Sequence, residues 1–323
     1  MSIKILGTGS YLPEHRVTND DLAKLVETSD EWIASRTGIR ERRIASFETT
    51  TYMAAKAGKR ALKQADVCPD EIDMILVATL SGDHATPNTA CQVQEIIGAD
   101  KAVCMDLSAA CSGFIFALNT ANVYIESGLA KTVLVIGAES LSKLVDWKDR
   151  GTCVLFGDGA GAAVVTKGTG IYETVMGSNG SKGAVLTCGE RKLSNLLVDT
   201  KQELEQIKMD GQEVFRFAVR TVPSCIRELL KKAGLCCEEI RYYLLHQANL
   251  RIIQSVAKRM KEPEEKFPVN VDLCGNTSSA SIPILLDEWN RKGNLSQEDK
   301  IVLCGFGGGL TWGAILLEWE SNK

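Results

Sequence analysis

Apolar runs and helical patterns alternate along the first half of the chain. Short continuous apolar runs are typical of buried strands, and apolar positions at helical spacing are typical of helices that pack on one face. They predict strands over 71–78, 102–107, 131–137 and 159–166, and helices over 89–97 and 112–126. Residues 2–7 also alternate like a strand. Strands that alternate with helices indicate mainly parallel sheets covered by helices.

The second half of the chain repeats the same order of elements. It predicts strands over 240–245, 269–273, 300–305 and 311–319, and helices over 250–260 and 278–291. A local similarity supports the match, because Phe156-Gly157-Asp158-Gly159 in the first half corresponds to Phe306-Gly307-Gly308-Gly309 in the second. We therefore predict an α/β protein of two halves, residues 1–168 and 169–323, packed with pseudo-two-fold symmetry. A polar, less regular stretch over 168–212 is predicted to join them.

The composition is that of an ordinary globular protein and narrows the possible functions. Charged residues make up 24% and hydrophobic residues 45% of the 323 positions, enough for a sizeable core. The net charge of −4 gives no global basis for binding nucleic acid or an anionic membrane. No segment approaches the roughly 20 apolar residues of a membrane helix, and no signal peptide is recognisable. We therefore expect a cytoplasmic protein.

The cysteines suggest neither a disulfide framework nor a metal site. There are 11 of them, an odd number, with scattered spacing and mostly apolar neighbours. The three histidines, His15, His84 and His246, lie far apart, whereas zinc sites draw on clustered Cys and His. Most of the cysteines are therefore expected to be small core residues, and no metal is expected.

Cys111 is the exception, because it lies where a predicted strand turns into a predicted helix. A thiol at a helix N-terminus is near the positive end of the helix dipole, which favours the nucleophilic thiolate. His246 and Asn276 lie far downstream, and each follows a predicted strand. Ligand sites in open α/β sheets lie beyond the carboxyl ends of strands, so the three residues can converge at the seam between the halves. A lone Cys with a distant His and Asn is typical of covalent catalysis by cysteine.

A set of motifs in a fixed order carries a resemblance to a known family. The chain resembles β-ketoacyl-acyl-carrier-protein synthase III, the initiating condensing enzyme of type II fatty-acid synthesis in the thiolase-like superfamily. The motifs are GTGSYLP at 7–13, SDEWI at 29–33, RTGIRER at 36–42, DRGT at 149–152, FGDGAGA at 156–162, HQANLR at 246–251, GNTS at 275–278 and GGGLTWG at 307–313. Each alone is moderately specific, and together they span nearly the whole chain.

The resemblance implies a fold and a reaction. The fold would be the five-layer thiolase-like fold with two βαβαβαββ halves, usually a homodimer. The reaction would be decarboxylative Claisen condensation of an acyl-CoA primer with malonyl-acyl carrier protein, without any cofactor besides the CoA thioester substrate. Cys111 would carry the acyl group, and His246 and Asn276 would donate hydrogen bonds to the enolate that forms as CO₂ leaves. The amides of Cys111 and Gly308 would form the oxyanion hole of acyl transfer.

The resemblance also assigns residues to substrate recognition. The contacts to CoA would be made by Thr28, Trp32, Arg36, Arg150 and Asn249, with the adenine stacked on Trp32. The acidic acyl carrier protein would dock on Arg251, Arg216, Lys258 and Arg259. The primer pocket would include Phe306 and, at the dimer interface, Thr86. Taken without the resemblance, the neighbouring Arg40, Arg42 and Arg43 are typical of a solvated charged loop.

Three other functions remain open on the residues alone. A relative in secondary metabolism could use the same residues to load an unusual starter. A degradative thiolase is disfavoured, because it would need a second catalytic cysteine in a CxGGG motif. Here two residues, the second of them Phe306, lie between Cys304 and the three glycines, where the motif has one. A non-catalytic acyl-CoA-binding protein is disfavoured, because Cys111, His246 and Asn276 are all present.

Overall fold

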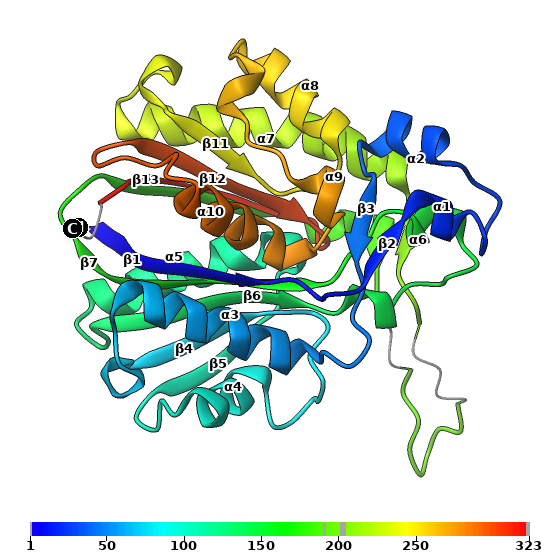
Figure 1. Ribbon diagram of the computed structural model, residues 1–323, viewed down its shortest axis with the longest axis horizontal. Helices are drawn as coiled ribbons and strands as arrows, with labels where there is room; N and C mark the ends of the chain where they lie inside the picture. The colour runs from blue at the N-terminus through cyan, green and yellow to red at the C-terminus, as the bar shows by residue number, and fades with distance from the viewer. Residues whose placement is uncertain (1, 190–191, 201–204, 321–323) are drawn as a thin grey trace.

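Two β-sheets form the frame of the protein in this computed structural model, which describes residues 2–189, 192–200 and 205–320 (Figure 1). The first sheet has the order β1-β7-β6-β4-β5, in which β4 runs parallel to β5 and β6. Its strands are β1 (Ser2–Tyr11), β4 (Met74–Ala78), β5 (Val103–Leu107), β6 (Thr132–Glu139) and β7 (Gly159–Gly168). All five lie in the first half of the sequence.

The second sheet repeats this arrangement with four strands in the order β11-β12-β13-β8. β11 and β12 are parallel, and β13 is antiparallel to both β12 and β8. The strands are β8 (Tyr172–Ser178), β11 (Tyr242–Leu245), β12 (Lys300–Gly307) and β13 (Thr311–Glu318). The central strands of both sheets are almost continuously buried, as expected of sheets covered on both faces.

Helices complete five layers (Figure 1). Two helices lie between the sheets and contact strands of both, two cover the outer face of the first sheet, and two cover the outer face of the second. In that order they are α5 (Gly113–Glu126) and α10 (Ser281–Arg291), α3 (Thr50–Ala65) and α4 (Thr89–Ile97), and α7 (Gly211–Ala233) and α8 (Leu250–Met260). The largest apolar cluster fills the central layer.

A smaller group of short elements packs at one end of the layers, on the right of Figure 1. It has its own apolar cluster around Leu22, Ile33 and Ile39, which joins residues of both halves. The elements are α1 (Asn19–Leu22), α2 (Asp30–Thr37), α6 (Arg150–Cys153), α9 (Val271–Cys274), β2 (Arg16–Thr18) and β3 (Glu41–Arg43). This end is where the strands leading to Cys111 and His246 finish.

The alternation of strands and helices predicted from the sequence is confirmed, with one wrong element. Residues 269–273 do not form a strand, and Val271–Cys274 is the short helix α9. The reason lies in Gln247, whose side chain donates to the carbonyls of Leu245 and Pro268 and accepts from the amide of Asn270. This side chain supplies hydrogen bonds that a neighbouring strand would otherwise make.

The stretch over 168–212, predicted as an irregular connection, has more structure than its composition suggested. It contains β8, an edge strand of the second sheet, and the short pair β9 (Leu186–Thr187) and β10 (Lys208–Met209). Residues 190–191 and 201–204 of this stretch lie outside the described residues. Helices α3 and α7 had not been predicted at all. Within the described residues, no helix combines the length and apolarity that crossing a membrane requires.

Candidate active site

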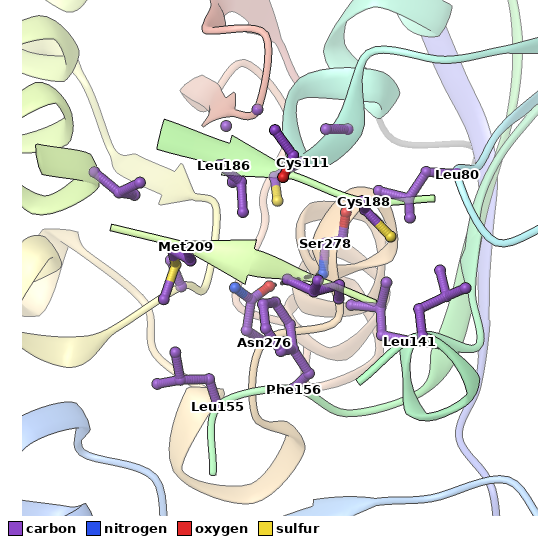
Figure 2. A pocket seen from close by; sticks show the side chains of 18 of the residues that line it. Leu80, Cys111, Leu141, Leu155, Phe156, Leu186, Cys188, Met209, Asn276 and Ser278 are labelled. Carbon is purple, nitrogen blue, oxygen red and sulfur yellow. Dashed lines mark hydrogen bonds between the residues drawn. The ribbon is translucent and has the colours of Figure 1, made fainter. Parts of the chain in front are cut away.

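A pocket of about 2270 Å³ opens at the seam between the two halves. Cys111, His246 and Asn276 all line it, although 135 and 30 positions separate them along the chain (111 to 246, and 246 to 276). Figure 2 shows apolar side chains such as Leu141, Leu155 and Leu186 around Cys111 and Asn276. Small-molecule sites typically enclose roughly 300–1,000 Å³, so this pocket is large enough for an extended ligand.

Cys111 lies at the strand-to-helix turn predicted from the sequence. β5 ends at Leu107, a 3-10 turn covers Ala110–Ser112, and α5 begins at Gly113. Ala110 has a left-handed φ of 45°, which turns the chain sharply before the helix. The side chain of Cys111 is buried, only 7% exposed, and faces the pocket.

The ionisation of Cys111 differs from the sequence-based expectation. Burial raises the pKa of the thiol to about 12, and the nearby Glu139 carboxyl acts in the same direction. The hydroxyl of Ser278 acts against this rise by lowering the same pKa. In this structure the thiol form therefore predominates at neutral pH, and the position at a helix N-terminus alone does not produce the expected thiolate.

His246 follows β11 and is held as a neutral imidazole. Its Nδ1 lies 2.6 Å from Ser281 Oγ, which also accepts a hydrogen bond from the Gln247 amide at 3.4 Å. Burial lowers the pKa of His246 to about 3. Among the described residues, the Ser281 hydroxyl has no other acceptor, so we assign its proton to the bond with Nδ1. The ring proton of His246 is then on Nε2, where it can be donated to a ligand.

Asn276 is fixed by hydrogen bonds at both its backbone and its side chain. Its amide donates to the Leu155 carbonyl at 2.9 Å, and its carbonyl accepts from the Gly157 amide at 3.0 Å. Its Oδ1 accepts from the Ser278 amide at 2.8 Å. With the side-chain oxygen engaged, the NH₂ group is the part of Asn276 left to donate to a ligand.

The turn between β12 and β13 packs directly on Cys111. A Cβ at Gly307 would lie 2.8 Å from the Cβ of Cys111 and 3.2 Å from its sulfur, so glycine is needed there. Gly308 follows and lines the pocket. This close approach brings the backbone of the second half to the nucleophile of the first.

The mouth of the pocket carries an aromatic ring that contacts two guanidinium groups. The Cζ atoms of Arg36 and Arg150 lie 4.5 and 4.7 Å from the centre of the Trp32 ring. Such spacing is typical of cation–π contacts. Trp32 and Arg36 line the pocket, whereas Arg150 lies beside it and donates to the Glu27 carbonyl at 2.8 Å. Both guanidinium groups are therefore in contact with the Trp32 ring.

Of the two other residues predicted to contact CoA, Asn249 lines the pocket and Thr28 does not. Asn249 lines the pocket, caps the N-terminus of α8 by accepting from the Arg251 amide, and donates to the Arg36 carbonyl. It thereby fastens α8 to α2 across the seam. Thr28 lies just before α2 and does not line the pocket, but its Oγ1 is buried without a hydrogen-bond partner among the described residues.

Comparison with known proteins identifies the family. Residues 105–180 match the family described as 3-oxoacyl-[acyl-carrier-protein (ACP)] synthase III, and residues 230–319 match its C-terminal domain. The chain is 51% identical to a β-ketoacyl-[acyl-carrier-protein] synthase III of Clostridium acetobutylicum over 98% of this chain and 99% of that protein. This chain belongs to the 3-oxoacyl-[acyl-carrier-protein] synthase III family.

Solved structures confirm the predicted thiolase-like fold. The crystal structure of the synthase III from Aquifex aeolicus VF5 has a TM-score of 0.92 at 49% identity, covering 98% of this chain and 100% of that one. The priming β-ketosynthase of the R1128 polyketide pathway also has a TM-score of 0.92, at 38% identity, covering 99% of this chain and 97% of that one. Both comparisons extend over the two halves and the seam.

In this member of the synthase III family, the predicted docking residues are divided between the pocket mouth and the surface beyond it. Arg251 and Arg216 line the pocket, with the Arg251 Cζ 5.8 Å from the Phe215 ring and Arg216 paired with Glu213. Lys258 and Arg259 are exposed in the last turn of α8 and do not line the pocket. At 1.5 Å per residue, Lys258 lies about 10 Å along the helix from Arg251.

The two predicted primer-pocket residues occupy different environments. Phe306 is 1% exposed, lines the pocket, and packs edge-on against the His246 ring with centroids 5.1 Å apart. Thr86 is exposed and lies outside the pocket, whose lining in this segment ends at Ala85.

The idea of a solvated basic loop at 40–43 is wrong for Arg42. This side chain is fully buried and donates to the Val17 carbonyl, to Asn19 Oδ1 and to the Val154 carbonyl. Burial lowers its pKa to about 10. Arg42 also packs its Cβ next to Gly275, which places it under the turn that carries Asn276.

Three features of the site were missed by the sequence analysis. Ser281 orients His246, and β9 with β10 bring Leu186, Cys188 and Met209 into the pocket wall (Figure 2). Glu139 ends β6 as a fully buried carboxyl that accepts from Ser81 Oγ at 2.5 Å, and burial raises its pKa. A carboxyl at the end of an otherwise apolar strand was the signal that could have revealed it.

Proposed function

We propose that this chain condenses an acyl-CoA primer with malonyl-acyl carrier protein through an acyl thioester on Cys111, and so initiates fatty-acid synthesis. Its family is one of acyltransferase-type condensing enzymes. The observation that carries the mechanism is that Cys111, His246 and Asn276 line one apolar pocket at the seam. No metal or further cofactor takes part in the proposed reaction.

The first half-reaction would be acyl transfer to Cys111. The sulfur forms a bond to the thioester carbon, the bond from that carbon to the CoA sulfur breaks, and the thiol proton passes to the departing CoA. The negative charge that develops on the thioester oxygen would be met by the amides of Cys111 and Gly308. The contact of Gly307 with Cys111 supports this role, because it fixes the glycine turn beside the reacting sulfur.

The second half-reaction would be decarboxylation of the malonyl group and attack on the acyl-Cys111 carbon. As CO₂ leaves, its bonding electrons form an enolate whose charge collects on the thioester oxygen. Neutral His246 with its proton on Nε2 and the NH₂ group of Asn276 are suitable donors to this oxygen. The new carbon–carbon bond then expels Cys111 as a thiolate.

The substrates would approach from the same side. CoA would lie along Thr28, Trp32, Arg36, Arg150 and Asn249, and Trp32 offers an aromatic ring on which the adenine would stack. The carrier protein would dock on the basic residues Arg251, Arg216, Lys258 and Arg259. The primer pocket would include Phe306 and, across a dimer interface, Thr86.

A homodimer formed along β5 fits the exposed edge of the first sheet. β5 pairs with β4 on one side only within the described residues, and Val103 on this edge is 62% exposed. Apolar edge strands are open to pairing with another chain. We further propose that residues 1–168 and 169–323 are the two duplicated halves, and that the protein is cytoplasmic.

Loading of an unusual starter in secondary metabolism is the second candidate. It is favoured by the similarity to the priming β-ketosynthase of the R1128 polyketide pathway. The same Cys, His and Asn would serve both reactions, so the nature of the accepted primer distinguishes them.

The test is to follow the two half-reactions separately. A panel of acyl-CoAs is incubated with the protein, and intact-mass measurement with peptide mapping locates the acyl group; we expect it on Cys111. His246→Ala and Asn276→Ala should spare this acylation more than they spare malonyl decarboxylation. An acyl group on another residue would refute the proposed nucleophile, and equal losses in both steps would refute the roles of His246 and Asn276. The acyl-CoAs that react distinguish fatty-acid initiation from unusual starter loading.

A further inference from the structure

One buried hydroxyl in the pocket has no hydrogen-bond partner of ordinary geometry among the described residues. Ser278 is 1% exposed and lines the pocket, yet its Oγ is unpaired. Buried hydroxyl groups are almost always hydrogen-bonded in native proteins, and the exceptions concentrate where a ligand or a reacting group supplies the partner. The surroundings of Ser278 therefore indicate which group it serves.

The backbone holds Ser278 firmly in an uncommon conformation. Its φ is +49°, in the left-handed region that a serine rarely adopts, and its amide donates to Asn276 Oδ1 at 2.8 Å. The 3-10 turn Ser278–Ala280 that it begins packs against the turn Ala110–Ser112, which carries Cys111. The two turns hold equivalent places in the two halves, since each precedes a helix of the central layer.

The Ser278 hydroxyl lies near two titratable groups, the Cys111 thiol and the Glu139 carboxyl, and it lowers the pKa of both; of the two, the thiol is the one that also lines the pocket. Burial and Glu139 raise the pKa of Cys111, and the side chain of Ser278 lowers it, which requires a donor close to the thiolate form of that sulfur. Both side chains line the same pocket, and the two turns that carry them pack against each other. No other side chain among the described residues acts on Cys111 in this direction.

We propose that Ser278 is a further catalytic residue, whose hydroxyl donates a hydrogen bond to Cys111 Sγ whenever that sulfur carries negative charge. This occurs when the sulfur attacks the thioester carbon as its own proton passes to the departing CoA. It occurs again when the new carbon–carbon bond expels Cys111 as a thiolate. Decarboxylation itself places its charge on the malonyl thioester oxygen and does not involve Ser278.

The inference rests on the proposed function for the identity of the substrates, but the contact with sulfur can be tested without them. Alkylation of Cys111 by iodoacetamide, followed across a pH series by peptide mapping, reports the pKa of this thiol directly. Mapping is needed because Cys68, Cys91, Cys188 and Cys236 are exposed and also react.

Two variants remove the hydroxyl in different backbone settings. Ser278→Ala keeps the left-handed strain, and Ser278→Gly relieves it. A hydrogen bond to a charged group stabilises that group more than a bond between neutral groups does. We therefore expect both variants to raise the pKa of the Cys111 thiol measured by alkylation, and to slow acyl transfer by roughly 10- to 100-fold. Release of CO₂ from malonyl-acyl carrier protein should change much less.

Thr277→Ala is the matched control. Thr277 is equally buried, and its Oγ1 is likewise unpaired among the described residues, but it does not line the pocket. We expect this variant to keep the wild-type alkylation profile. An unchanged alkylation pKa in both Ser278 variants, or an equal change in Thr277→Ala, would overturn the proposal. Failure of the wild-type protein to become acylated would instead count against the proposed function, because alkylation does not depend on it.

Discussion

Ser281 offers the sharpest test of how the second half of the molecule prepares His246. Its hydroxyl lies 2.6 Å from His246 Nδ1 and accepts from the Gln247 amide, and this arrangement fixes the ring proton on Nε2. Replacing Ser281 by Ala removes this preference and leaves the imidazole in place. We therefore expect Ser281→Ala to slow decarboxylation of the malonyl group while leaving acyl transfer to Cys111 nearly unchanged.

The size of the loss follows from what is removed. A neutral hydrogen bond contributes about 1 kcal/mol net, and a tenfold change in rate corresponds to about 1.4 kcal/mol, so the loss should be about 5-fold. Removing the donor itself with His246→Ala should cost about 10²- to 10³-fold, as for other preorganised donors to an oxyanion. The predicted order of decarboxylation rates is therefore wild type, then Ser281→Ala, then His246→Ala.

The tautomer can be observed as well as the rate. The chain has only three histidines, so ¹⁵N labelling of histidine gives a spectrum that His246→Ala assigns. We expect the wild-type ring to carry its proton on Nε2 and Ser281→Ala to show a mixture, with Ser281→Thr restoring the wild-type signals because it keeps the hydroxyl. A proton on Nδ1 in the wild type, or a rate in Ser281→Ala equal to that of His246→Ala, would refute this reasoning.

Three further predictions concern charge. Because the pKa of Glu139 is raised in the folded state, the folded protein holds the Glu139 proton at higher pH than the unfolded chain does. The contribution of this group to the free energy of unfolding therefore falls as pH rises above about 4.5. Glu139→Gln should flatten this fall when the free energy of unfolding is measured with urea across a pH series. Arg251→Glu should weaken turnover of malonyl-acyl carrier protein more than acyl transfer from acyl-CoA, and this defect should shrink as salt rises. The control Lys131→Glu, which changes a residue just before β6 and outside the pocket, should cause no such defect. A defect that does not depend on salt would count against docking at Arg251. With its pKa lowered to about 3, His246 should produce no inflection in the decarboxylation rate between pH 5 and 8, and a step near 6.5 would contradict the neutral assignment.

The sequence was sufficient for features that depend on a repeating local pattern. Strands such as β4 and β12 are continuous apolar runs, and α8 shows a clear apolar stripe, so their positions follow from periodicity alone. The convergence of Cys111 with His246 also follows, because each comes after a strand, one in each sheet, and both strands finish at the same end of the layers. These features follow from local sequence patterns that occur in both halves of the chain.

Helices α3 and α7 were missed although their pattern is local, but the other features that escaped prediction depend on contacts between distant segments. The alternation in 269–273 fits a strand, but Gln247 supplies hydrogen bonds that a strand partner would make. Arg42 reads as one of several surface charges, and only the fold shows that Val154 and Asn19 enclose it. The ionisation of Cys111 was misjudged for the same reason: its helix position is local, whereas its burial is produced by the whole seam.

Burial disfavours the charged forms of the titratable groups around the reaction. Burial raises the pKa of Cys111 to about 12 and lowers that of His246 to about 3, and it raises the pKa of Glu139. A pocket with standing charges would bind one ionic state of the substrate tightly and gain little in the transition state. Neutral donors such as His246 and Asn276 instead interact most strongly when charge appears on the substrate, and the apolar surroundings strengthen that interaction. The burial that disfavours the thiolate form of Cys111 is thus the same burial that makes these donors effective. The proposed hydrogen bond from the Ser278 hydroxyl would offset this cost whenever the sulfur of Cys111 carries negative charge.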